Sequence, residues 1–371
     1  MRIALCTETV FPIYGVERRV YEMARRLPNY GIEPTIITSL GEKYDTSLDL
    51  LKASDHTISM APKRNLGNCV KYSLNTFRLL SRKYDIIDAN GHMALLPCFA
   101  GAKKSGRPIV ATIHDIYGND WKSMYKSRAS FAGKYIERLL CMMPYDRLIA
   151  LNKTAKKRLI GMGVPRERLE VIYSGIDTKK IDKIKAEKKN RNVVVYVGRL
   201  VPQKNLDILI RAFSQLKHDA SLSIIGDGSE LENLKYLAKS LGVDIEFTGN
   251  LRNDDVIKKM KEASILSLTS SRENFGIVPL EAMRCKTAVI STKTEGPIDY
   301  IENGKNGLLV DIGSIQQISD KIDMLLSDKR MLSRVQKNGF ETSERFDWEN
   351  IIRSIADMYY KILDESGKFT R

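Results

Sequence analysis

The chain has 371 residues, of which 43% are apolar and 28% charged. This length exceeds one ordinary hydrophobic core and predicts two domains, and this composition excludes a disordered chain. The five cysteines are odd in number and scattered, which indicates reduced thiols in a cytoplasmic protein. The start of the chain lacks a signal-peptide pattern, and the longest uncharged run, residues 89–102, is too short to span a bilayer, so we expect a soluble or peripheral protein.

The net charge of +15 is unevenly distributed, because most of the basic excess falls in the first 180 residues. A basic half is expected to face an anionic partner, such as a membrane, a nucleic acid or a phosphorylated substrate. General solubilising charge is the alternative explanation.

Short branched runs alternate with helical patterns along the whole chain, which predicts parallel α/β sheets. In the first half we expect a helix over 16–30 that ends at Gly31, and a basic helix over 153–162. The predicted strands of this half are 2–6, 35–38, 86–87, 109–113, 147–151 and 169–172.

Two positions in the first half lie where parallel sheets bind ligands, at the carboxyl ends of predicted strands. Gly15 ends the loop after the first strand, and His114 follows strand 109–113. An imidazole there can donate a hydrogen bond to a sugar hydroxyl or a phosphate oxygen. A plain tight turn at Gly15 and a structural histidine are the alternatives.

Residues 119–143 interleave aromatic and basic side chains at helical spacing, including Trp121, Tyr135, Lys134 and Arg138. This pattern is typical of a helix at the surface of an anionic membrane. A surface helix whose aromatic face packs on its own domain is the alternative.

The polar, lysine-rich segment 178–191 predicts the domain boundary, and the apolar run 193–198 then opens a second domain as a buried parallel strand. This strand delivers Arg199 and Lys204, two cations suited to an anionic group. Exposed surface charges are the alternative. The other elements predicted here are helix 205–216, strand 222–225, helix 230–241, strands 245–248 and 288–291, helical sequence from 314, and a final helix over 348–363.

Strand 263–268 is followed by a turn and a helix whose first turn is fixed by Pro279. The backbone N–H groups of 275–278 then point outward from a helix start, which is an arrangement that binds phosphate. Glu273 and Glu281 flank this turn. Carboxylates beside a phosphate site are suited to hydroxyl-rich groups, because they accept hydrogen bonds from sugars.

Glu273 and Glu281, with seven residues between them, resemble the E-x7-E motif of the retaining glycosyltransferases of family four, which have the GT-B fold. The resemblance implies that Glu281 holds the ribose of a nucleotide-sugar and that Glu273 contacts the donor sugar. His114, in a Thr-x-His-Asp context, is similar to a family histidine that reaches the donor sugar. The other donor-binding residues that it implies are Gly15, Arg199, Lys204, Leu251, Asn274, Phe275, Gly276, Ile277 and Val278.

The same resemblance implies the architecture, an α/β fold of two Rossmann-like doubly wound parallel-sheet domains facing across a cleft. We expect an acceptor-binding domain over 1–180, with 346–371 packing back on it, and a nucleotide-sugar-binding domain over 192–345. Tyr14 and Ser174 depart from the family pattern, which has a glycine and an asparagine there.

The function expected from this resemblance is metal-independent, retaining hexosyl transfer from a UDP- or GDP-linked sugar, with no cofactor. The basic first domain favours a lipid-linked or saccharide acceptor at an anionic membrane surface and no nucleic acid partner. We expect a cytoplasmic protein, peripheral on the inner face of the cell membrane. The alternatives are a sugar-nucleotide isomerase (epimerase) of the same fold and a non-catalytic membrane- or nucleic-acid-binding protein; a phosphorylase lacks support in the sequence.

Overall fold

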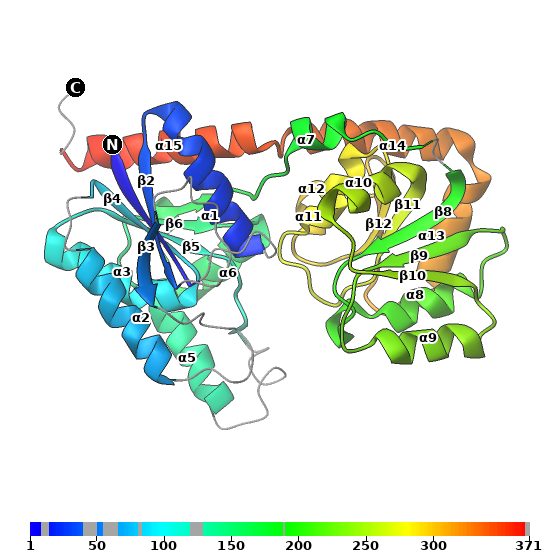
Figure 1. The fold of residues 1–371 in the computed structure, drawn as a ribbon, viewed down its shortest axis with the longest axis horizontal. Helices are drawn as coiled ribbons and strands as arrows, with labels where there is room; N and C mark the ends of the chain where they lie inside the picture. The colour runs from blue at the N-terminus through cyan, green and yellow to red at the C-terminus, as the bar shows by residue number, and fades with distance from the viewer. Residues whose placement is uncertain are drawn as a thin grey trace. The chain divides into compact units, whose positions relative to one another are not determined.

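The computed structural model describes residues 1–8, 15–39, 50–54, 66–80, 84–118, 129–187 and 190–367 (Figure 1). The chain forms two compact units, Met1–Ser174 with Glu349–Arg371, and Gly175–Trp348. The units therefore divide at 174, before the lysine-rich segment in which we placed the boundary. That segment opens the second unit with α7 (Thr178–Lys183), where Ile181 is buried.

The first unit contains a seven-stranded parallel sheet in the order β3-β2-β1-β4-β5-β6-β7. The order reverses between β1 and β4, which is the point where open α/β sheets bind ligands. The strands are β1 (Arg2–Thr7), β2 (Glu33–Ser39), β3 (Leu50–Ser54), β4 (Ile86–Asn90), β5 (Ile109–Ile113), β6 (Arg147–Ala150) and β7 (Leu169–Val171). The sequence prediction missed β3, whose run is interrupted by a lysine.

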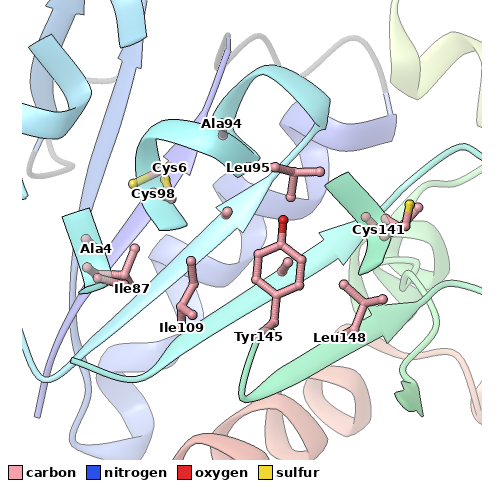
Figure 2. Close-up of a cluster of buried hydrophobic side chains, with 14 of the residues drawn as sticks. Ala4, Cys6, Ile87, Ala94, Leu95, Cys98, Ile109, Cys141, Tyr145 and Leu148 are labelled. Atoms are coloured by element: carbon pink, nitrogen blue, oxygen red, sulfur yellow. The ribbon is translucent and has the colours of Figure 1, made fainter. Parts of the chain in front are cut away.

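Helices cover both faces of this sheet. Right-handed crossovers place α2, α3, α5 and α6 on one face and α1 on the other. The α15 helix lies beside α1, since Glu349 of α15 forms an ion pair with Arg26 of α1. Figure 2 shows side chains of α3 and α5, including Leu95 and Cys141, lying against β4, β5 and β6. The helices are α1 (Gly15–Arg26), η1 (Leu27–Tyr30), α2 (Leu66–Leu79), α3 (His92–Ser105), α5 (Ala129–Met142), α6 (Lys153–Met162), η3 (Arg166–Arg168) and α15 (Trp348–Glu365).

The final helix belongs to the first unit from Glu349 onward, three residues later than the predicted start at 346. Arg26 of α1 donates to Glu349 of α15 at 2.7 Å, and the Tyr30 hydroxyl donates to the Glu349 carbonyl at 3.3 Å. The predicted helix end at Gly31 is also confirmed, because this glycine has a φ of 70° and caps the preceding turn.

The second unit has a six-stranded parallel sheet in the order β10-β9-β8-β11-β12-β13. Its strands are β8 (Asn190–Val197), β9 (Ser221–Ile225), β10 (Ile245–Gly249), β11 (Ala263–Leu268), β12 (Ala288–Thr292) and β13 (Leu308–Val310). Its remaining helices are η4 (Pro202–Lys204), α8 (Leu206–Phe213), α9 (Leu231–Ser240), α10 (Asn253–Glu262), α11 (Ile277–Arg284), α12 (Pro297–Tyr300), α13 (Ile315–Ser327) and α14 (Lys329–Glu344). The predicted class of two doubly wound parallel-sheet domains is confirmed.

The chain enters and leaves the second unit along two paired segments. The Ile176 N–H donates to the Phe346 carbonyl at 2.8 Å, and the Trp348 N–H donates to the Ile176 carbonyl at 3.1 Å. A Cβ at Gly175 would lie 2.6 Å from the Trp348 ring, so this position requires glycine.

All five cysteines are free thiols, and Cys69 is the one that is not fully buried. Within the described part of the chain, no helix is long and apolar enough to cross a membrane.

Candidate functional site

Glycines join the carboxyl ends of three strands of the second unit. The Gly198 N–H donates to the Ile225 carbonyl at 3.0 Å, and the Gly226 N–H donates to the Gly249 carbonyl at 2.9 Å. A Cβ at Gly226 would lie 2.0 Å from the Gly198 carbonyl oxygen, so the two backbones can pack only with glycine there. This packing fixes the start of the loop that carries Arg199, whose side chain is exposed.

The loop after β8 is also tied to the segment after β11. The Ser271 N–H donates to the Gln203 carbonyl at 2.9 Å, and the Thr269 hydroxyl donates to the Lys204 carbonyl at 2.9 Å. The Lys204 Nζ lies 2.6 Å from the Glu273 Oε2, with 16% and 24% of these side chains exposed. Two residues that the sequence predicted as separate donor contacts therefore form an ion pair.

The turn between β11 and α11 has the geometry that the sequence predicts. Gly276 has a φ of 78° at the N-cap of α11, a region that favours glycine. Ile277 and Val278 are the first residues of the helix, whose initial N–H groups lack partners within it. The start of α11 is therefore suited to an anion, with Lys204 and Glu273 beside the turn that precedes it.

Residues far along the chain hold this turn in place, and the sequence analysis missed them. The Gly296 N–H donates to the Glu273 carbonyl at 2.9 Å, and the Tyr300 hydroxyl donates to the Gly276 carbonyl at 2.9 Å. Burial raises the pKa of Tyr300 well above its usual value, so its hydroxyl stays a donor. The Tyr300 ring packs on Phe275 and Phe346, with centroids 6.0 Å and 5.5 Å away.

The second carboxylate of the motif lies one turn further into α11. Glu281 is buried, with 5% of its surface exposed, whereas Glu273 is partly open to solvent. Asn274, whose Oδ1 lies 3.5 Å from the Arg272 Nε, is half-buried, as is Leu251 after β10. The predicted donor-binding residues of the second unit thus lie in the loops after β8, β10 and β11 and in the first turns of α11.

In the first unit, His114 is buried at the end of β5. Its Nε2 lies 3.4 Å from the Asn90 Oδ1, and the Asn90 Nδ2 donates to the Asp88 Oδ1 at 3.0 Å. Burial, with smaller contributions from Arg19 and His92, lowers the pKa of His114 well below its usual value. The imidazole is therefore neutral at physiological pH, and it acts as a hydrogen-bonding group rather than a cation.

Asp88 is the centre of a buried polar network behind His114. Its carboxylate accepts a hydrogen bond from the hydroxyl of Tyr359 on α15. The charge of the buried Arg19 also acts on Asp88, and the Arg19 Nη1 donates to the Tyr173 carbonyl at 2.5 Å. Burial raises the pKa of Asp88 to about 6, against the opposing effects of Tyr359, Arg19 and Asn90. Burial also lowers the pKa of Arg19 to about 10, which the charge of Asp88 partly offsets.

This network makes the stability of the protein dependent on pH. Because the pKa of Asp88 is raised from 3.8 to about 6 on folding, its contribution is full below pH 3.8 and is lost as the pH rises through 6. We expect a decrease of about 3 kcal/mol in the free energy of unfolding over this window. Asp88→Asn removes that slope, as urea unfolding at pH 4 to 7 will measure; equal slopes in both proteins would show that Asp88 does not titrate there.

The remaining predicted positions of the first unit are less informative. Gly15 is the exposed first residue of α1, and no atom of the described residues lies within 4 Å of a Cβ built there. The loop before it, and residues 119–128 of the basic aromatic segment, lie outside the described residues.

The first unit also contains polar residues to which the sequence assigned no role. The His92 Nε2 lies 3.5 Å from the Oε1 of the buried Glu137. The sequence did contain a signal for Asp88 and Asn90, because these two polar residues lie at the carboxyl end of the otherwise apolar strand β4.

Family models match both halves of the chain, as Glycosyltransferase Family 4 over residues 13–180 and as Glycosyl transferases group 1 over residues 177–342. The lipopolysaccharide core biosynthesis glycosyltransferase of Rhizobium meliloti is 31% identical over 359 residues, 94% of this chain and 95% of that protein. The chain therefore belongs to the group 1 glycosyltransferases of family 4 and is a glycosyltransferase.

Two further comparisons extend over nearly the whole chain. An uncharacterized glycosyltransferase of Methanocaldococcus jannaschii is 27% identical over 364 residues, 95% of this chain and 96% of that protein. The crystal structure of Anabaena HepE in complex with UDP-glucose superposes with a TM-score of 0.79 at 23% identity, covering 97% of this chain and all of that one. This structural likeness supports the GT-B fold.

Proposed function

We propose that this glycosyltransferase is a retaining enzyme that takes its sugar from a nucleotide-diphosphate-sugar. The observation that carries the proposal is the Lys204–Glu273 pair, 2.6 Å apart beside the turn that opens α11. The bond between a donor sugar and its diphosphate needs a cation on the phosphate side and a hydrogen-bond acceptor on the sugar side. An adjacent ammonium and carboxylate supply both.

Each proposed residue then has a defined role. Arg199, Lys204 and the N–H groups at the start of α11 stabilise the diphosphate as it departs. Glu281 accepts hydrogen bonds from the ribose hydroxyls and Glu273 from the hydroxyls of the transferred sugar. His114, as a neutral imidazole whose Nε2 faces the Asn90 Oδ1, accepts a hydrogen bond from a hydroxyl of the sugar through its other ring nitrogen. In the chemical step the bond from the anomeric carbon to the phosphate oxygen breaks, and the acceptor oxygen bonds on that same face. The acceptor proton passes to the diphosphate.

The relatives indicate which substrates to test first. The Anabaena neighbour binds UDP-glucose, and the Rhizobium relative is named for lipopolysaccharide core biosynthesis. We therefore propose a UDP- or GDP-linked sugar as the donor, and a lipid-linked or membrane-surface glycan or a phospholipid as the acceptor. Because protein cations and backbone N–H groups neutralise the diphosphate, we propose that no metal ion is needed.

A product assay tests this function against the isomerase alternative. UDP- and GDP-sugars are incubated with and without saccharide and lipid-linked acceptors, and the anomeric proton of the product is read by NMR. We expect transfer only with acceptor, the anomeric configuration of the donor in the product, and turnover unchanged within about twofold in EDTA. Conversion of the donor without acceptor would instead establish an isomerase, and an inverted product would exclude a retaining mechanism.

A further inference from the structure

Helices α2, α3 and α5 lie on one face of the sheet of the first unit, and we call the outward side of these three helices the basic face. Its exposed cations are Lys71, Arg78, Lys103, Lys104, Lys134 and Arg138. Glu137 is the one carboxylate in these three helices, and it is buried and accepts hydrogen bonds from the Tyr117 and Gly118 N–H groups at 2.8 and 2.7 Å. The positive charge of the basic face is therefore not balanced from within these helices.

Large apolar side chains are exposed on the same helices, between the cations. Leu139 is 68% exposed, and on α5 it lies on one stripe with Tyr135 and Met142, at helical spacings of four and three residues. The other helices add Val70, Leu74 and Leu96, each more than half exposed. Scattered single apolar residues need no explanation, but a set on adjacent helices indicates an interaction surface.

The opposite side of the same sheet has a different character. There α15 carries four carboxylates, Glu349, Asp357, Asp364 and Glu365, against two cations, Arg353 and Lys361. The neighbouring α1 carries four arginines against two glutamates, so the charges of these two helices cancel. Its large apolar residues, such as Ile352 and Tyr359, are buried. The combination of cations and exposed apolar side chains therefore distinguishes one side of this unit and is not a property of the whole chain.

We infer that the basic face docks on the surface of an anionic lipid bilayer. Lys and Arg are attracted to anionic headgroups, while Leu139, Tyr135 and Met142 insert at the boundary between headgroups and acyl chains. A second copy of the chain is a poor occupant, because two basic faces repel each other. A nucleic acid would match the charge but leaves the exposed aliphatic side chains without a function. The inference rests on the proposed function in one respect, since a membrane-bound acceptor gives docking its purpose.

The size of the effect follows from the number of groups involved. Each cation near an anionic surface strengthens binding by about fivefold, so removing two weakens it by about 25-fold. Replacing a Leu that inserts into the bilayer by Gln costs about tenfold. Raising the ionic strength from 0.1 to 1 M shortens the screening length from about 10 to about 3 Å, which releases the protein.

Vesicle sedimentation tests the inference with the full chain and no sugar donor present. The vesicles contain phosphatidylcholine alone, or phosphatidylcholine with about one third phosphatidylglycerol. Lys103→Gln/Arg138→Gln removes two cations from the basic face, and its matched control, Arg353→Gln/Lys361→Gln, removes two exposed cations from α15. Leu139→Gln is matched by Tyr236→Gln on α9, whose side chain is 77% exposed.

We expect the wild type to bind only the anionic vesicles, the basic-face variants to lose about 25-fold and about tenfold, and both controls to stay within twofold of wild type. Equal binding by the basic-face variants and their controls would overturn the inference. So would equal binding to neutral vesicles, or tight binding to an oligonucleotide with none to vesicles. Nucleotide binding by the same variants, measured without vesicles, tests the proposed function separately. Because the substituted residues lie outside the donor site, loss of vesicle binding and loss of nucleotide binding can be told apart.

Discussion

Glu281→Ala is expected to weaken binding of the nucleotide donor by about 10- to 100-fold while the protein remains folded. Glu281 is buried one turn into α11, where its carboxylate is proposed to accept from two ribose hydroxyls. Hydrogen bonds to a charged acceptor contribute about 1.5–3 kcal/mol each, and part of this is recovered by water in the variant. Calorimetric titration of wild type and variant with the same nucleotide measures the loss.

Two companion variants make this result specific. Glu281→Gln keeps the volume and one accepting oxygen, so it should lose less affinity than Glu281→Ala. Glu273→Ala should mainly lower kcat, because its proposed contact is with the sugar that reacts rather than with the nucleotide. Equal and small effects of Glu273→Ala and Glu281→Ala would contradict the roles assigned to both.

Gly296→Ala is expected to displace the turn that precedes α11 and to weaken nucleotide binding at least tenfold. Gly296 has ordinary helical dihedral angles, so alanine meets no backbone strain there. Its Cβ, however, would lie 2.3 Å from the Phe275 carbonyl oxygen and 2.5 Å from its Cα, and backbone cannot move aside as a flexible side chain can. Overpacking of this kind costs about 1–3 kcal/mol, which urea unfolding will measure together with the loss of affinity.

The matched control is Gly161→Ala on α6, where the added Cβ has no neighbour within 4 Å in the part of the chain that the structure describes. Alanine should stabilise that helix by about 0.5–1 kcal/mol and leave nucleotide binding unchanged. If Gly296→Ala bound the nucleotide as tightly as Gly161→Ala, the position of the turn would not matter for the donor site.

Local signals made much of the second unit predictable from its sequence. The short, branched and uncharged run 263–268 coincides with β11, and Pro279 located the start of α11 to within a few residues. By contrast α10, whose sequence is mostly charged with a narrow apolar stripe that buries Ile257 and Met260, was missed. Helices of this kind are stabilised by packing on the sheet more than by propensity, so their local signal is weak.

Contacts between distant residues were the part of the site that the sequence could not supply. Nothing in the local pattern of Gly296, Tyr300 or Phe346 links them to the turn at Gly276, because the fold alone brings these segments together. The pairing of Lys204 with Glu273 was hidden for the same reason, since 69 residues separate them. The buried charge of Arg19 could not be predicted either, because an arginine on an amphipathic helix is usually exposed.

The central claim is that the second unit binds a nucleotide diphosphate at the loops after β8 and β11. Calorimetric titration of the wild-type protein with UDP, GDP and ADP tests it most directly. We expect one of the three nucleotides to bind with a dissociation constant in the micromolar range. The corresponding free energy of binding is about −8 kcal/mol at 1 μM and a few kcal/mol weaker at the upper end of that range. Absence of binding by all three nucleotides at millimolar concentration would contradict it.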